Sequence, residues 1–424
     1  MSEKRTKACG IDVHKNLLVA TILDCDGNSV TRQFRNTLKC ISVLKTWVIQ
    51  NECDVVAFES TGNYYQTLYR CLYPEITVEV ANAYYIKKVP GKKTDTLDSQ
   101  WIAQLALNKQ IPSSRIFTGD DRDFRLLTRH RKKLVEDMTV YKNIIHMILE
   151  SADIHLSSVL TNIFGVSGML ILEALVDGKD LDSVFAQLPP RIQYKKEELK
   201  EAISGSLNQC ELLQLRSCLD MLSLLTKERE IIDTQIANYV RKLYSEEYAI
   251  LCSIPGIGFT SAAVILSEIG DIHDFIKPDN LASWAGLVPS VYQSAGVLRS
   301  GSITKHGNEH LRWIAVECAH SCARKKGTHL HAFFERVKKR AGYKKAIVAL
   351  ARKLLVLIWH LLINKEVYKD EGFKEKKDIS IPTFLTIVDK IGKEEALKLI
   401  QMGRDIGKDF GMVQIKGKEV GEIL

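Results

Sequence analysis

Four carboxylates in the first hundred residues stand where a metal-dependent phosphoryl-transfer site could form. Asp12 ends the first predicted strand, and Glu59 ends the fourth. Asp95 and Asp98 are three residues apart at the start of a predicted helix, so both face the same way. Such hard oxygen ligands suit Mg²⁺ or Mn²⁺, and two such ions can clamp the attacking and leaving oxygens of a phosphodiester. Any one acid alone reads as a helix cap or turn residue, so the prediction depends on all four together.

The elements that would position these acids follow an α/β pattern. In order, the sequence predicts strands at 7–12, 17–23 and 29–34, a helix at 38–50, a strand at 54–60, a helix at 64–73, a strand at 76–83 and a helix from residue 94. The dipeptide Asp26-Gly27 is typical of a hairpin turn. Three antiparallel strands followed by alternating helix and strand is the order of an RNase H-like domain.

Three motifs around the acids resemble a known family. GIDVHK (10–15), FESTGNY (58–64) and KKTDTLDS (92–99) are similar to the D-E-D-D signature of the IS110 family of insertion-sequence transposases. The resemblance implies that the N-terminal domain is similar to RuvC-type junction resolvases. It also implies that Asp12, Glu59, Asp95 and Asp98 are both catalytic and metal-binding, with Mg²⁺ or Mn²⁺ as the cofactor.

The middle of the chain is expected to be helical. Residues 122–133 form an amphipathic basic pattern in which Arg129 and Lys132 either contact nucleic acid or lie on a solvated face. Apolar residues from Leu215 to Leu243 then recur at alternating steps of three and four, with Arg229 as the one polar member. This heptad seam predicts a coiled coil. We expect a contact between subunits, because the family acts as an oligomer; an internal helical hairpin is the alternative.

Two glycines later in the chain suggest a phosphate contact. The run Pro255-Gly256-Ile257-Gly258 lies between two helical stretches and resembles a helix-hairpin-helix motif. In that motif a glycine turn allows backbone N–H groups to approach a DNA phosphate. A plain tight turn between helices is the alternative.

A second block, 284–319, resembles the C-terminal signature of the same family. Gly286-Leu287-Val288-Pro289 and Thr304-Lys305-His306-Gly307-Asn308 match, whereas Ala295 interrupts the expected Ser-Gly pair. The family's serine nucleophile maps best to Ser294, and Ser300 and Ser302 remain open. Arg299, Lys305 and Arg312 could hold phosphates or a developing negative charge.

Positive charge is concentrated in one segment. The chain has a net charge of +8, but residues 324–353 alone hold eleven Lys or Arg and one Glu. Lys338, Lys339, Lys344 and Lys345 are therefore candidates for a phosphate-binding surface, with a solvated face as the alternative.

Several classes of protein are not expected. The longest apolar run, 354–363, is about half the length of a membrane span, and the N-terminus lacks the apolar core of a signal peptide. Ten scattered cysteines without a CxxC pair indicate reduced thiols in a cytoplasm. The cluster of Cys318, His320, Cys322, His329 and His331 fits no standard zinc module.

These patterns predict a multidomain protein. We expect an RNase H-like (RuvC-like) α/β catalytic domain at 1–150, a helical and coiled-coil insertion at 151–245, a mostly α-helical transposase domain with the serine at 246–368, and a tail of unknown role at 369–424.

The predicted function is site-specific DNA recombination for an insertion sequence. The resemblance implies a composite site of metal and serine, donor and target DNA as partners, a structured noncoding guide RNA, and a homo-oligomer, dimer or tetramer, in the prokaryotic cytoplasm at the nucleoid. The alternatives are a RuvC-like junction nuclease that uses water, and a non-catalytic nucleic-acid scaffold.

Overall fold

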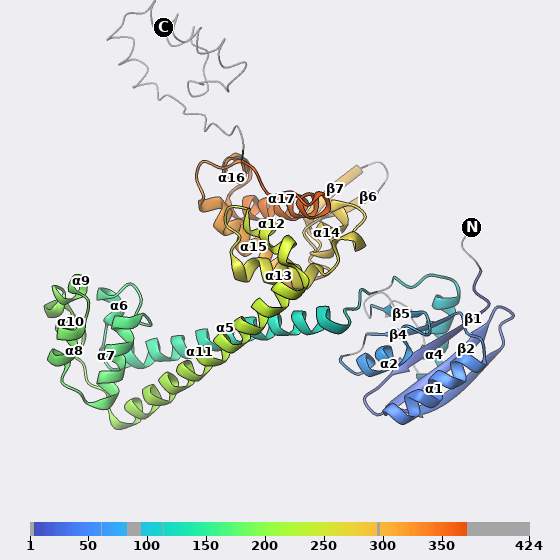
Figure 1. Ribbon diagram of the computed structural model, residues 1–424, viewed down its shortest axis with the longest axis horizontal. Coiled ribbons are helices and arrows are strands. Elements are labelled where there is room, and N and C mark those ends of the chain that lie inside the picture. The colour runs from blue at the N-terminus through green and yellow to red at the C-terminus, as the bar shows by residue number, and fades with distance from the viewer. Residues whose placement is uncertain (1–3, 61, 83–94, 113, 295–296, 371–424) are drawn as a thin grey trace, which may run out of the picture. The chain divides into compact units, whose positions relative to one another are not determined.

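The chain forms two compact units, Met1–Phe117 and Thr118–Leu424 (Figure 1). The computed structural model describes residues 4–60, 62–82, 95–112, 114–294 and 297–370, and the side chains of all of these except 291–300. Most of the expected tail at 369–424 therefore lies outside the described residues. The first boundary falls near residue 117 instead of 150, because the helix α5 (Gly119–Ser151) packs along helix α11 (Gln209–Leu243) of the second unit.

The first unit contains a five-stranded mixed sheet. Its strands are β1 (Lys7–Val13), β2 (Leu17–Asp24), β3 (Ser29–Arg35), β4 (Val55–Glu59) and β5 (Val78–Ala81), in the order β3-β2-β1-β4-β5. The first three strands pair antiparallel, whereas β1 with β4 and β4 with β5 are parallel. The predicted α/β order is confirmed, strand by strand.

Helices cover both faces of this sheet. Alternate residues of a strand point to opposite faces, and β1 follows this rule: Cys9 and Ile11 pack with helices α1 (Leu38–Gln50) and α2 (Tyr65–Leu72), whereas Ala8 packs with helix α4 (Asp95–Leu107). Gly10 and Asp12 share the α4 face with Ala8 by the same alternation.

Gly10 allows α4 to lie directly against β1. A Cβ atom at this position would be 2.2 Å from the carbonyl oxygen of Ser99 and 2.3 Å from the backbone nitrogen of Ala103. The buried hydroxyls of Ser99 and Thr21 are 2.7 Å apart and join α4 to β2 beside this contact. The backbone of α4 is thus held against the sheet close to the end of β1.

The second unit is mostly helical, as expected for the C-terminal part of the chain. Besides α5 and α11, its elements are α6 (Leu156–Val159), α7 (Val166–Asp177), α8 (Leu181–Gln187), α9 (Pro190–Gln193), α10 (Lys196–Ala202), α12 (Ser245–Cys252), α13 (Phe259–Ile269), the 3-10 helix η1 (Ile272–Asp274), α14 (Pro278–Trp284), β6 (Pro289–Ser294), β7 (Val297–Ile303), α15 (Glu309–Arg324), α16 (His329–Ala341) and α17 (Tyr343–Asn364).

The predicted heptad seam faces α5 of the same chain. Leu215, Cys218, Leu222 and Ile236 are buried, and Arg131 on α5 pairs with Asp233 on α11 at 2.5 Å. The seam therefore has an intramolecular partner, which corresponds to the helical-hairpin alternative, and a contact between subunits stays a prediction.

The second unit has two apolar cores. The first core is formed by the second half of α5, the first half of α11, α6–α8 and α10. The second core is formed mainly by α12–α17. Helix α17 is, among the described residues, the one helix long and apolar enough to cross a membrane, but half of that stretch is buried inside the protein. Its residues Leu350, Leu354 and Ile358 belong to the second core, which accounts for their apolar character.

Three features bear on the sequence-based expectations: the stretch after Pro289, the cysteines, and the Cys/His segment at 318–331. The polar stretch after Pro289 forms the antiparallel hairpin β6–β7, which the sequence pattern did not predict. All ten cysteines are free, in agreement with reduced thiols. The Nδ1–H of His331 donates to the Ala323 carbonyl at 2.7 Å, and the described Cys and His side chains of this segment form no metal-type cluster.

Candidate metal centre and hairpin base

The four predicted acids belong to one face and one end of the first unit's sheet. Asp12 and Glu59 each follow the last residues that pair β1 with β4, Ile11 and Phe58. Alternation along β4 puts Glu59 on the α4 face, because Val55 and Ala57 pack with α4 and Phe58 packs on the opposite side. Asp95 and Asp98 occupy the first turn of α4.

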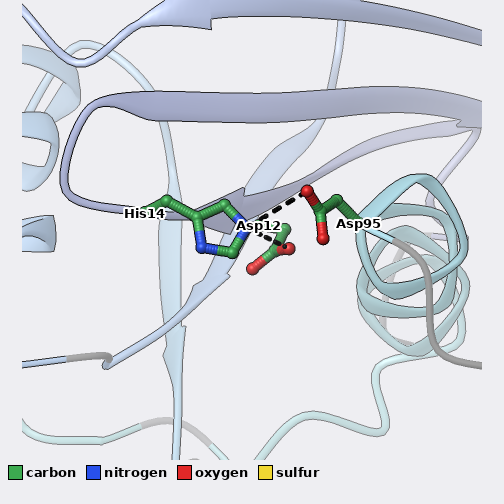
Figure 2. A group of neighbouring side chains, drawn as sticks. All are labelled: Asp12, His14 and Asp95. Carbon is green, nitrogen blue, oxygen red and sulfur yellow. Dashed lines mark ion pairs between the residues drawn. The ribbon is translucent and has the colours of Figure 1, made fainter.

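Figure 2 shows the close approach of three of these side chains. His14, just beyond the end of β1, lies with its Nε2 atom 3.0 Å from Oδ2 of Asp12 and 3.5 Å from Oδ2 of Asp95. Asp12 is 18% exposed at its side chain, whereas His14 and Asp95 are about half exposed. The cluster is therefore open to solvent on the α4 side and sheltered at Asp12.

Electrostatics at Asp12 favour a bound cation. Burial raises the pKa of the Asp12 carboxyl above its ordinary value; His14 acts against this shift, and the charges of Asp95 and Asp98 add to it. A carboxylate whose neighbours are carboxylates is stabilised in its charged form by a cation placed among them. The influence of Asp98 on Asp12 also indicates that Asp98 belongs to the same cluster.

The donor set fits a divalent cation. One ligand atom from each of Asp12, His14 and Asp95 lies within 4.8 Å of the other two, close enough to surround one ion. Carboxylate oxygens suit Mg²⁺ and Mn²⁺, and an imidazole nitrogen is tolerated better by Mn²⁺ and later metals. Glu59 and Asp98 would extend the set from the neighbouring strand and the same helix turn.

His14 is the member of this cluster that sequence reasoning missed. Its signal was present in GIDVHK, because a residue two positions after Asp12 extends from the same face of a strand.

The second signature block forms the base of the β6–β7 hairpin. A Cβ on Gly286 would be 2.5 Å from the His306 carbonyl oxygen, and one on Gly307 would be 2.3 Å from that of Trp284. The Asn308 N–H donates to the Trp284 carbonyl at 2.6 Å. The two matching segments, far apart in sequence, are thus bonded backbone to backbone where the hairpin begins and ends.

A buried carboxylate supports this base from behind. Glu268 on α13 is fully buried and accepts hydrogen bonds from Arg125 at 2.7 Å, from Arg129 at 2.7 and 3.0 Å, and from the Asn308 side-chain amide at 2.7 Å. Asn308 also caps α15, accepting from the Leu311 N–H. Sequence reasoning missed Glu268, although a lone acid inside the apolar run AAVILSEI signals a buried partner.

Several residues predicted to bind nucleic acid have partners inside the protein, and their contact with nucleic acid stays a prediction. Arg129 pairs with Glu268, and Arg312 donates to the carbonyls of Ala285 and Lys305 at 3.0 and 3.1 Å. Lys132 pairs with Glu136 and lies 5.0 Å from the ring centre of Trp313. These contacts give Arg129, Lys132 and Arg312 structural roles.

The helix-hairpin-helix prediction has a mixed outcome. Helices α12 and α13 flank the glycine turn as expected. Gly256, however, faces α15, since a Cβ there would be 2.8 Å from the backbone nitrogen of Cys322. Gly258 is exposed with nothing within 4 Å of the corresponding position, so a phosphate contact at Gly258 stays a prediction.

The remaining site predictions are only partly described. The side chains of Ser294, Arg299 and Ser300 lie outside the described part of the structure, as do residues 295 and 296 entirely. Lys305 is exposed, as are Lys338, Lys339, Lys344 and Lys345. Of these, Lys338 forms an ion pair with Glu335 at 3.0 Å.

Replacing the buried Glu268 with glutamine is expected to destabilise the second unit by about 3–5 kcal/mol, because two partly buried guanidinium groups lose their charged partner. Burial raises the pKa of Glu268, but Arg129, Arg125 and Asn308 outweigh it, so the folded-state pKa lies below the ordinary value. The stabilisation is therefore present above about pH 4.5 and is lost as the pH falls through the folded pKa.

Urea unfolding of wild type and Glu268→Gln between pH 7 and pH 3 measures this difference. The difference in the free energy of unfolding between wild type and Glu268→Gln should become smaller as the pH falls. Glu228→Gln, an exposed acid on α11, is the matched control and should leave the unfolding midpoint unchanged. A glutamine variant as stable as wild type at pH 7 would contradict the assigned role.

Comparisons with known proteins agree with both parts of the site. A family model for transposases of the D-E-D-D IS110 type matches residues 9–153, which contain the Asp12 cluster. A second, described as the transposase IS116/IS110/IS902 family, matches residues 248–335, which contain Glu268 and the hairpin base.

Individual relatives extend this similarity along the chain. The transposase for insertion sequence element IS1111A of Coxiella burnetii is 25% identical over 87% of this chain and 93% of that protein. The transposase for IS1328 of Yersinia enterocolitica is 21% identical over 73% and 82%, and the pilin gene-inverting protein of Moraxella bovis is 31% identical over 27% and 36%. This chain is an enzyme that belongs to the IS110 family of insertion-sequence transposases.

Proposed function

We propose that this transposase cleaves and rejoins DNA strands at specific sites, using a bound divalent metal and a serine nucleophile. The observation that carries the proposal is the placement of Asp12, Glu59, Asp95 and Asp98 at one end and on one face of the sheet. The strand order β3-β2-β1-β4-β5 supports an RNase H-like, RuvC-like fold for the first unit. The name of the Moraxella bovis relative, a gene-inverting protein, supports exchange of strands at defined sites.

In this proposal the acidic cluster is the metal site. Asp12, Glu59, Asp95 and Asp98 would hold Mg²⁺ or Mn²⁺, with His14 as a further donor. A divalent cation in such a site supplies charge neutralisation at phosphate oxygens. The protein's part is to keep the carboxylates together at the end of the sheet and to prevent the repulsion between them from separating β1 and α4.

The serine would carry the covalent step. Ser294 is our assignment on the β6–β7 hairpin, with Ser300 and Ser302 as alternatives. Its Oγ attacks the scissile phosphorus; an Oγ–P bond forms, the bond from phosphorus to the 3′ oxygen breaks, the serine loses its proton and the leaving 3′ oxygen gains one. The DNA 5′ end stays on the serine, and attack by another 3′ hydroxyl reseals a strand without ATP.

The remaining partners are proposed from the family resemblance. A structured noncoding RNA would pair with donor and target DNA, which would leave the protein to bind backbone and shape. The exposed cations Lys305, Lys338, Lys339, Lys344 and Lys345, together with Arg299, would contribute to that binding. We further propose that the protein acts as a homo-oligomer at the nucleoid in the cytoplasm.

A strand-exchange assay with purified full-length protein tests this function. Donor and target DNA carrying the element's ends are incubated with the flanking transcript and Mg²⁺, Mn²⁺ or EDTA, and the product ends are sequenced. Rejoined strands that need the metal are expected. Cleavage that leaves free 5′ phosphates and no joined product would instead indicate a junction nuclease, and binding without cleavage in any metal would indicate a scaffold.

A further inference from the structure

A groove of about 730 Å³ runs between α17 and the base of the β6–β7 hairpin. Its floor is apolar: Ile303 comes from the end of β7, Val348 from α17 and Phe333 from α16. Its volume is in the range of small-molecule and ligand sites. None of the three floor residues is fully buried, so a ligand in the groove can reach them.

Four cations line the same groove. Lys344 and Lys345 lie at the start of α17, and Arg352 and Lys353 follow about 12 Å further along the helix at 1.5 Å per residue. Among the described residues that line the groove, none is acidic. Arg352 is held by Asp279 at 3.0 Å from outside the lining. Lys344 and Lys345 thus present positive charge at one end of the apolar floor, and Lys353 does so at the other.

The cations and the floor are in direct contact. Lys353 places its Nζ 4.6 Å from the ring centre of Phe333, on which Arg336 also lies at 5.5 Å. An aromatic ring beside cations is an arrangement that can receive a nucleobase and its phosphate together. A double helix offers phosphates to such a groove but keeps its bases stacked inside, so the apolar floor would have no partner.

We propose that this groove binds an unpaired polynucleotide strand, with phosphates on Lys344, Lys345 and Lys353 and a base against Phe333, Val348 and Ile303. The proposal rests on the proposed function only for its class of ligand, a phosphodiester strand. DNA and RNA share that chemistry, and the experiment distinguishes between them. Ser302 and Ile303 line the groove, so a strand bound there would lie at the base of the hairpin.

Fluorescence anisotropy on the full-length protein in EDTA tests the proposal. The probes are one sequence as single-stranded DNA, as single-stranded RNA and as duplex DNA, and a single strand of equal charge with abasic sites. Both unpaired strands with bases are expected to bind tighter than the duplex, and loss of the bases should weaken binding at least about fivefold. The stronger of the DNA and RNA arms identifies the source of the strand.

Two matched charge reversals test whether the unpaired strand binds in the groove. Lys345→Glu should weaken binding of the unpaired strand by roughly tenfold and lower its log–log salt slope by about 0.7 or more. Lys227→Glu makes the same charge change at an exposed position of α11 outside the lining and should have a clearly smaller effect. Val348→Ser should remove part of the difference between base-containing and abasic strands while circular dichroism remains unchanged.

Three results would overturn the inference: a duplex that binds as tightly as the single strands, an abasic strand that binds as well as the normal one, or equal effects of the two lysine reversals. Because the assay contains EDTA and no cleavage is measured, these failures leave the metal and serine chemistry untouched. Loss of strand exchange with groove binding intact would, conversely, count against the proposed function alone.

Discussion

A protein–DNA adduct on Ser294 is expected when the transposase acts on a suicide substrate. The substrate carries a nick or a bridging phosphorothiolate beside the scissile bond, so the released 3′ end cannot reverse the attack. The adduct should hold the DNA 5′ end, should need Mg²⁺ or Mn²⁺, and should be absent from Ser294→Ala, because that variant lacks the attacking hydroxyl. A denaturing gel detects the adduct, and mass spectrometry identifies the modified peptide.

The neighbouring serines are the controls for this assignment. Ser300→Ala and Ser302→Ala should still form the adduct, and DNA binding by all three variants should equal that of wild type. An adduct that persists in Ser294→Ala moves the role to Ser300 or Ser302. Cleavage by wild type without any adduct means that water is the nucleophile.

Asp12→Asn is expected to lower strand cleavage by roughly a thousandfold or more, because the most sheltered carboxylate of the cluster loses its charge. Calorimetric titration with Mn²⁺ should show a large loss of affinity in the same variant. Without metal, the first unit should be at least as stable as wild type, since Asp95 and Asp98 then repel one charge fewer.

Asp26→Asn is the matched control for charge. Asp26 is exposed in the turn between β2 and β3 of the same unit, so its neutralisation changes the net charge equally without touching the cluster. Metal binding and cleavage should both be retained there. Wild-type cleavage by Asp12→Asn, or undiminished cleavage in EDTA, would contradict the metal site.

Local sequence signals were sufficient to predict most of the first unit. Alternation and the Asp26-Gly27 turn predicted all three antiparallel strands, and the ends of β1 and β4 were predicted to within one residue. The heptad pattern predicted the packing face of α11 but could not name its partner, because an apolar seam has the same sequence whether the facing helix belongs to the same chain or to another.

The second unit shows where local reasoning fails. Arg129 and Arg312 are basic residues in basic surroundings, and only the tertiary fold brings a buried Glu268 and two carbonyl groups to them. The β6–β7 hairpin was missed because its mostly polar sequence lacks the apolar alternation of a half-buried strand. His14 could be predicted from the alternation of side chains along a strand. The partners of Glu268, in contrast, can be identified only from the tertiary fold.

Gly10 has a consequence for how the first unit can vary. It has no side chain to bind, donate or ionise, yet the 2.2 Å that would separate a Cβ from the Ser99 carbonyl leaves no room for even a methyl group. A methyl group there would push α4 from the sheet and move Asp95 and Asp98 away from Asp12. In a mutational scan scored by transposition, Gly10 would thus tolerate substitution as poorly as the carboxylates do, although it has no functional group. The loss of transposition there would report only the displacement of α4 from the sheet.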